Sequence, residues 1–178
     1  MFPHRFILEL PPWLDSFLFD RVYPTDEARV NLAVELAGHN SRQGAGGPFG
    51  AAVFESATGK LVAPGVNLVA PARASAAHAE IVALTLAQQA LGSHRLTGCE
   101  LATSTEPCAM CLGAIPWSGV SRVLCGAREE DAREAGFDEG DKPPDWPAAL
   151  AGRGIEVRRD ILREAARGVL RAYRGPRY

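Results

Sequence analysis

Two short segments of the sequence bring together residue types that bind metals and move protons. His78 and Glu80 open one predicted helix, and Cys108 and Cys111 open another further along the chain. Cysteines three positions apart lie about 60° apart around a helix, so both thiols can reach one ion, and their place in the first turn favours the zinc-binding thiolate forms. His78 and Glu80 lie about 200° apart, so both can approach a metal only beyond the helix end. These spacings predict a metal between two helix N-termini.

Three protein ligands, His78, Cys108 and Cys111, leave one tetrahedral position open, which is typical of catalytic zinc and not of structural zinc. Zinc can lower the pKa of a water in that position to about 7, and Glu80 is the carboxylate that can take its proton and pass it to a substrate. The alternatives are a structural site closed by Cys99 or Cys125, and a chance Cys-x-x-Cys pair. Both other cysteines border or lie in predicted strands, which favours core packing.

The elements that must position these residues alternate in type. Thr25 is typical of an N-cap, and a helix should follow it and end near Gly44. The ranges 49–55 and 60–63 predict a hairpin, with 66–70 as a further extended piece. The remaining predicted elements are helices over 78–91, 108–115 (stopping near Pro116) and 161–173, and strands over 100–103, 122–126 and 155–158. Strands separated by helices indicate an α/β fold with a largely parallel sheet covered on both faces.

Length and composition predict one globular domain. The chain has 178 residues, of which 47% are hydrophobic and 22% charged. We expect a single domain over 1–178, in which residues 1–24 form a proline-broken N-terminal arm. No long apolar window and no signal-peptide pattern is present, so we expect a cytoplasmic protein without a membrane partner. A core of this size needs no disulfides, which leaves all four cysteines available for chemistry.

The C-terminal part of the chain is basic although the whole chain has a net charge of −2. Four arginines, at 159, 163, 167 and 171, recur every four residues and so share one helical face. A solvated helix face is one interpretation, and a nucleic-acid surface is the other, since phosphate binding needs such a stripe. The acidic remainder of the chain favours the first, so we do not expect a nucleic-acid partner.

A longer set of motifs resembles the cytidine deaminase fold, in its branch of guanine deaminases and tRNA adenosine deaminases. The resemblance covers roughly residues 26–140. Its motifs are Gly46-Gly47-Pro48-Phe49-Gly50, Asn67, His78-Ala79-Glu80, the run EPCAMCLGAI from Glu106 to Ile115, and Trp117. The segment 131–140 is similar to the one that places an acidic residue in the pocket of guanine deaminases. The resemblance implies a three-layer α/β/α sandwich around a mostly parallel five-stranded sheet, a zinc cofactor and a homodimer.

The same resemblance implies roles for further residues. Glu139 is the second proton carrier and sets the preference for guanine, whose N1–H and 2-amino groups are adjacent donors that a carboxylate can accept. The implied substrate-binding set is Asn67, Phe49, Ala79, Trp117 and Phe137, with the aromatic rings stacking on the base. The structural alternatives are an exposed loop acid for Glu139, a turn residue for Asn67 and core packing for the aromatic residues.

The expected function is the zinc-dependent hydrolysis of guanine to xanthine and ammonia, with related rings such as ammeline as further substrates. A cytosine or nucleoside deaminase, a tRNA adenosine deaminase and a non-catalytic zinc module are the alternatives. Two segments depart from the family: Arg73–Ala77 replaces a common Asp-Pro pair, and residues 142–178 match only loosely. In this family the C-terminal segment can complete a partner's active site, a role that Tyr173 or Tyr178 would serve here.

Overall fold

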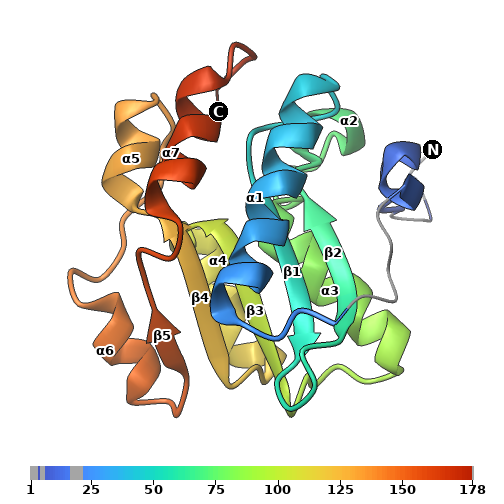
Figure 1. Cartoon of the computed structure of the whole chain (residues 1–178), viewed down its shortest axis with the longest axis vertical. Coiled ribbons are helices and arrows are strands. Elements are labelled where there is room, and N and C mark those ends of the chain that lie inside the picture. Colours follow the sequence, from blue (N-terminus) through green and yellow to red (C-terminus); the bar gives the residue numbers. More distant parts are fainter. Residues whose placement is uncertain (1–3, 5–6, 17–21, 178) are drawn as a thin grey trace.

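The computed structural model describes residues 4, 7–16 and 22–177 of the chain. These residues form a five-stranded sheet in the order β2-β1-β3-β4-β5 (Figure 1). The strands are β1 (Gly50–Glu55), β2 (Leu61–Val66), β3 (Cys99–Thr105), β4 (Arg122–Ala127) and β5 (Glu156–Arg158). The predicted hairpin makes β1 antiparallel to β2, and β1 is also antiparallel to β3, whereas β3, β4 and β5 run parallel. Parallel and antiparallel pairings are therefore equally represented, so the sheet is mixed and not mostly parallel as predicted.

Helices cover both faces of this sheet, which confirms the three-layer α/β/α fold (Figure 1). One core layer joins the sheet to α1 (Asp26–Arg42) and α7 (Arg163–Ala172), and the other joins it to α3 (Ala79–Leu91), α4 (Ala109–Ser118) and α6 (Trp146–Ala151). Three short helices complete the described chain: the 3₁₀ helix η1 (Pro12–Ser16), α2 (Val69–Ala72) and α5 (Glu129–Glu134). Within the described parts of the chain, no helix combines the length and the apolar character needed to cross a membrane.

A glycine in β2 lets α3 lie directly against the sheet. A Cβ atom at Gly65 would fall 2.3 Å from the carbonyl oxygen of Ala79 and 2.5 Å from the amide nitrogen of Ala83. Any larger residue would collide with helix backbone, which cannot move aside as a flexible side chain can. Because Ala79 is the first residue of α3, this contact fixes the helix end that carries His78.

Several element boundaries follow from local hydrogen bonds. Thr25 caps α1 as predicted, because its Oγ1 accepts the Ala28 N–H at 3.1 Å. The predicted extended piece over 66–70 is wrong in its second half: Oδ1 of Asn67 accepts the N–H of Val69 at 3.3 Å, a turn that leads into α2. The predicted stop near Pro116 is also wrong, because α4 continues to Ser118, whose hydroxyl donates to the Ile115 carbonyl at 2.7 Å.

Two helices, α5 and α6, lie where the sequence predicted no regular element. The helix α5 follows β4 directly, and α6 begins within the proline-containing stretch 138–147. Asp145 caps α6 by accepting the N–H of Ala148 at 3.3 Å, with a proline in the first turn. That pattern is a known helix start, and it could have identified α6 from the sequence.

The arginine stripe of α7 is engaged in ion pairs with α5. The side chain of Asp131, which is 1% exposed, lies 2.8 Å from Nε of Arg163 and 3.2 Å from Nε of Arg167. Arg167 also lies 2.8 Å from Glu134. The guanidinium groups of Arg163 and Arg167 hold two helices together and are only partly exposed, so this part of the stripe is neither a fully solvated face nor an open phosphate-binding surface.

We expect the Asp131→Asn variant to be less stable than the wild type at pH 7 by about 2 kcal/mol, because it leaves two partly buried arginines without their shared carboxylate. Burial disfavours the carboxylate, but hydrogen bonding and charge from Arg163 outweigh it and lower the pKa of Asp131 below its ordinary value of 3.8. The stabilisation is therefore complete above that value and is lost as the pH falls through the lower folded-state pKa.

Urea unfolding of the wild type and of the Asp131→Asn variant, from pH 7 downwards, measures this effect. The difference between the two proteins should shrink below about pH 4. Glu164→Gln, which removes an 81% exposed carboxylate of α7, is the matched control and should cost little. Equal stabilities of wild type and Asp131→Asn at pH 7 would show that the pairs contribute nothing.

Candidate active site

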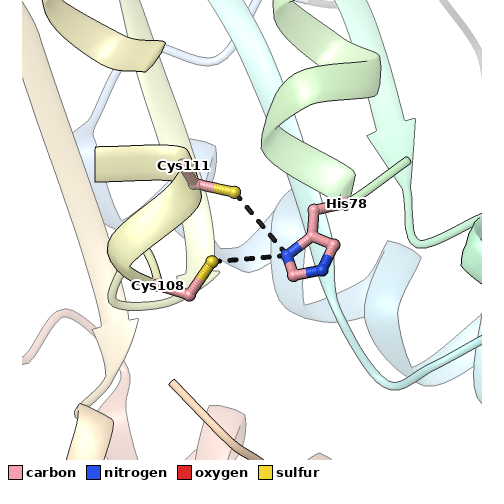
Figure 2. A group of neighbouring side chains, drawn as sticks. All are labelled: His78, Cys108 and Cys111. Carbon is pink, nitrogen blue, oxygen red and sulfur yellow. Dashed lines mark hydrogen bonds between the residues drawn. The ribbon is translucent and has the colours of Figure 1, made fainter. Parts of the chain in front are cut away.

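Three metal-ligating side chains converge at the facing ends of α3 and α4. His78 is the N-cap of α3, Cys108 is the N-cap of α4, and Cys111 lies one turn further on. The Nδ1 atom of His78 is 3.4 Å from Sγ of Cys108 and 3.7 Å from Sγ of Cys111 (Figure 2). All three ligand atoms lie within 4.8 Å of one another. The structure thus brings together, between two helix N-termini, the three residues that the spacing singled out.

The distances between these atoms fit a tetrahedral zinc ion. With bonds of about 2.3 Å to sulfur and 2.0–2.1 Å to nitrogen, a tetrahedral zinc separates neighbouring S and N ligands by about 3.6 Å. The observed 3.4 and 3.7 Å lie on either side of that value. Among the described residues no fourth His, Cys, Asp or Glu joins the group. Cys99 and Cys125 pack in the core layer beneath α3 and α4, so the described donor set is that of an open site.

The cluster is arranged to stabilise negative charge on sulfur. A hydrogen bond from Cys111 lowers the pKa of the Cys108 thiol to about 4, with a further contribution from His78 that outweighs burial. The hydrogen bond that Cys111 donates to Cys108, together with burial, raises the pKa of the Cys111 thiol. Burial disfavours the His78 cation, but the bond to Cys108 and the nearby negative charges raise the pKa of His78. A helix N-terminus at Cys108 adds to the same preference for a thiolate.

Two buried carboxyl groups lie beside the metal-ligating residues. Glu80 is in the first turn of α3 and is 8% exposed, and Glu139 is in the loop between α5 and α6 and is 4% exposed. Burial, with the negative charge of Cys108, raises the pKa of Glu80 to about 7 and that of Glu139 to about 8. Groups with such values exchange protons readily near neutral pH, as general acids and bases must. Glu139 is therefore not the exposed loop acid of the alternative interpretation.

One narrow cavity joins these groups to the expected substrate-binding residues. Its lining comprises Phe49, Asn67, His78, Glu80, Glu106, Cys108, Phe137, Asp138 and Glu139. The rings of Phe49 and Phe137 meet edge to face, with centroids 4.8 Å apart. The free volume is about 20 Å³, which is roughly the space of one water molecule. The free space between these walls is therefore narrow.

Two of the expected substrate-binding residues lie elsewhere. Trp117 is 81% exposed and borders a separate hollow of about 270 Å³ on the outer side of α4, so it does not line the cavity of its own chain. Six positions on a helix turn a side chain by about 240°, which directs Trp117 away from the face that carries Cys111. Ala79 is fully buried at the start of α3 and is outside the lining of the cavity.

Asn67 serves in a turn and also lines the cavity. Its Oδ1 atom accepts the N–H groups of Gly47 and Val69, at 3.4 and 3.3 Å. Nδ2 of the buried Asn40 donates to the carbonyl groups of Gly47 and Asn67, at 3.1 and 3.0 Å. A Cβ atom at Gly46 would fall 2.0 Å from the Asn67 carbonyl oxygen, so only glycine allows this close approach. These contacts fix the orientation of the Asn67 amide.

Two residues near the cavity had no expected role. Glu106, which is 3% exposed, accepts hydrogen bonds from the Arg159 guanidinium and from the Glu129 N–H. Glu106 could have been recognised in the sequence as an acidic residue directly before Pro107 and Cys108. Lys142 donates from Nζ to the Pro107 carbonyl at 3.1 Å. It lies between α5 and α6, where no element was predicted and a single lysine carries no recognisable signal.

The C-terminal segment lies beside one wall of this cavity in its own chain. Tyr173 is buried, and its ring is tilted against that of Phe137 with centroids 5.8 Å apart. Arg177 donates from Nε to the carbonyl of Ala135 at 2.5 Å. Tyr178, the other expected C-terminal contributor, lies outside the described residues.

Comparisons with known proteins agree with this geometry. The family model of the cytidine and deoxycytidylate deaminase zinc-binding region matches residues 24–127. Guanine deaminase of Bacillus subtilis (strain 168) is 43% identical over 113 residues, which are 64% of this chain and 71% of that protein. The solved structure of guanine deaminase from Nitrosomonas europaea has a TM-score of 0.92 and 46% identity, with coverage of 97% of this chain and 98% of the other. A solved mutant protein in complex with 8-azaguanine has a TM-score of 0.91 and 46% identity, with 97% of each chain covered. The chain therefore belongs to the cytidine and deoxycytidylate deaminase family, in its branch of guanine deaminases.

Proposed function

We propose that the protein hydrolyses guanine to xanthine and ammonia with a zinc ion held by His78, Cys108 and Cys111. The observation that carries the proposal is the pair of buried carboxyl groups, Glu80 and Glu139, in one cavity beside the three metal-ligating side chains. The similarity to guanine deaminases, and to a structure that contains 8-azaguanine, supports guanine as the substrate. When bound, zinc supplies a Lewis acid that activates water for attack on C2 of the base.

Glu80 is the general acid and base of the proposed reaction. It follows His78 by two positions, and its pKa of about 7 lets it take a proton from water and return it to the ring nitrogen next to C2. The burial that raises this pKa also keeps bulk water from competing for the proton. A purely structural metal site has no use for such a group.

Glu139 recognises the edge of guanine on which the reaction occurs. Guanine presents N1–H and the 2-amino group as neighbouring donors, and a carboxylate can accept both. Cytosine and adenine do not present this pair. With its pKa near 8, Glu139 gains and loses a proton near neutral pH, so its ionised form can accept from both donors and its protonated form can supply the proton that the departing amino group needs to leave as ammonia. In the whole reaction, water supplies the oxygen that replaces the amino group at C2.

Asn67, Phe49 and Phe137 hold the ring in this arrangement. The amide of Asn67 is fixed by backbone contacts, so it offers a preset polar group to the base. The two aromatic side chains give the cavity flat apolar walls, which suit a planar heterocycle. The ion pairs of the α7 arginines disfavour the alternative of a tRNA-editing enzyme with a phosphate-binding stripe.

The first test measures ammonia release by the zinc-loaded protein from guanine, ammeline, cytosine, guanosine and adenosine. Guanine should be turned over, and Glu80→Gln should lower kcat by about 10²–10⁴-fold because the proton carrier is lost. Glu139→Gln should lower kcat/KM for guanine sharply, because an amide cannot replace a double acceptor that also moves protons. Glu35→Gln on α1 and Asp141→Asn in the same loop, both exposed acids, are the matched controls.

Each other outcome points to a specific error. If guanine is inert and cytosine or a nucleoside is hydrolysed, the assignment of Glu139 is wrong while the role of Glu80 stands. If only RNA is deaminated, the free-base proposal fails.

The four cysteines allow a matched test of the metal site. We expect one zinc per chain in the wild type, and little or none in His78→Ala and Cys111→Ser, since each removes one of only three proposed protein ligands. Cys99→Ser and Cys125→Ser should keep the metal, because both thiols lie in the core. Elemental analysis of the purified variants measures this directly. Loss of zinc from either core variant would indicate a closed, four-ligand site instead.

A cytoplasmic location is part of the proposal. All four cysteines are free thiols, a state that a reducing compartment preserves.

We further propose that the protein forms a homodimer through the outer side of α4. Trp117 and Met110, two of its exposed large apolar residues, lie on this helix. The hollow bordered by Leu112, Trp146 and Leu150 lies beside Trp117. A protruding ring next to an apolar hollow is the arrangement that a two-fold axis can make self-complementary.

Sedimentation velocity tests the dimer. The wild type should sediment as a dimer, and Trp117→Ser should shift the population towards monomer, because it removes the largest exposed apolar group. Leu91→Ser, which changes an exposed apolar residue at the end of α3, is the control and should leave the distribution unchanged. A monomeric wild type, or a dimer indifferent to Trp117→Ser, would contradict this interface.

A further inference from the structure

A buried lysine lies behind the loop that carries Glu139. The side chain of Lys142 is 2% exposed, and its Nζ atom is 3.1 Å from the Pro107 carbonyl oxygen and 3.0 Å from a carboxylate oxygen of Glu129. The ammonium group also lies 5.6 Å from the centroid of the Trp146 ring. These partners belong to three separate segments: the residue before Cys108, the start of α5 and the start of α6. Burying a cation costs free energy unless it is compensated, so this one is held by a built set of contacts.

The backbone of the loop around Glu139 is held by hydrogen bonds at Glu139 and at Gly140. The carbonyl of Glu139 accepts the N–H of Ala109 at 2.9 Å, and the carbonyl of Gly140 accepts from the Arg133 guanidinium at 2.7 Å. Gly140 has a φ of +67°, and a Cβ atom there would lie 3.0 Å from Cβ of Ala109. The loop therefore lies in direct contact with the first residue of α4. Two residues further on, Lys142 donates the next hydrogen bond, to the carbonyl of Pro107.

The two basic side chains that hold the loop, Arg133 and Lys142, share one acidic partner. Arg133 and Lys142 both pair with Glu129, at 2.7 and 3.0 Å, and the N–H of Glu129 in turn donates to Glu106. The chain that follows Glu139 is thus tied twice to the same acid at the start of α5, through Arg133 at Gly140 and through Lys142. Without the Lys142 ammonium group, the segment after Gly140 would lose its bond to the residue that precedes Cys108.

We propose that Lys142 is a positioning residue, which holds the Glu139 carboxyl at a fixed place over the metal-ligating end of α4 by binding the Pro107 carbonyl. The proposal deepens the proposed function and rests on it, because it takes Glu139 to act on the substrate. Lys142 does not line the cavity and touches no reacting atom. A displacement of about 1 Å at a catalytic group can cost about 10²-fold in rate, so a fastening of this kind affects turnover.

The first measurement does not depend on activity. The Ala109 N–H is bonded to the Glu139 carbonyl, so its hydrogen exchange reports whether the loop lies in place. We expect Lys142→Met, which keeps the chain length and removes the charge, to speed this exchange at least tenfold. Lys142→Arg should keep part of the protection. Lys60→Met, at the only other lysine and an exposed one, should not change it. Unchanged exchange in Lys142→Met would overturn the proposal, whatever the enzyme does.

Kinetics of the zinc-loaded variants then separate positioning from general stability. Lys142→Met should keep one zinc per chain and lower kcat/KM for guanine about tenfold or more, with partial rescue in Lys142→Arg. In a Glu139→Gln background the same change should cost less than twofold, because Lys142 acts through Glu139. The proposal fails if the kcat/KM losses of Lys142→Met and Glu139→Gln multiply in the double variant, or if loss of zinc accounts for the whole effect of Lys142→Met. Lys142 would then serve the stability of the metal site.

A failure of the proposed function gives a different pattern. If Glu139→Gln alone leaves guanine turnover unchanged, the role of Glu139 is wrong. Faster exchange at Ala109 in Lys142→Met would then still establish the fastening, but its effect on catalysis would be refuted.

Discussion

The candidate site depends on two helix N-termini meeting at one point. The N-cap positions of α3 and α4 hold His78 and Cys108, whose side chains make no capping hydrogen bonds to their own helices. Each therefore directs its donor atom across the gap towards the other helix (Figure 2). The positive ends of the two helix dipoles would repel a bare cation, but they stabilise thiolate and carboxylate groups, and these in turn attract a metal. The approach of α3 to β2 at Gly65 fixes one side of this arrangement.

The burial of acids beside a thiolate gives the cavity its proton chemistry. Glu80 and Glu139 would be ionised in water, but desolvation and the charge on Cys108 bring both pKa values near neutrality. Such burial is unfavourable in itself, and it persists because surrounding segments are held by other charged contacts. Glu106 with Arg159, and Glu129 with Arg133 and Lys142, belong to this surrounding layer. Active sites commonly place groups in environments that oppose their ordinary ionisation.

Sequence reasoning identified the parts of this structure that depend on local spacing. The Cys108 and Cys111 pair, the Thr25 cap and the hairpin follow from intervals of a few residues, and all are present; His78, thirty positions before Cys108, joins the pair through its place at a second helix start. The role of Lys142 could not be predicted from the sequence, because it depends on Pro107 and Glu129, which are distant in sequence and meet only in the fold. Trp117 lies apart from the cavity of its own chain, because membership of a motif does not say which face of a helix a residue occupies. Its helical position relative to Cys111 indicates that face. Asn67 both starts a turn and lines the cavity, so its role in the turn does not conflict with the proposed role in binding.

The division of the cavity between rigid helices and a loop has a consequence for how such proteins diversify. His78, Glu80, Cys108 and Cys111 come from helix ends packed on the sheet, whereas Phe137, Asp138 and Glu139 come from one short connection between α5 and α6. The metal-ligating residues and Glu80 are thus encoded apart from the connection that carries Glu139. Replacement of the connection alone would change one part of the cavity wall and leave the metal-ligating helix ends in place. The same separation makes this connection the natural segment to randomise in a search for new deaminase substrates.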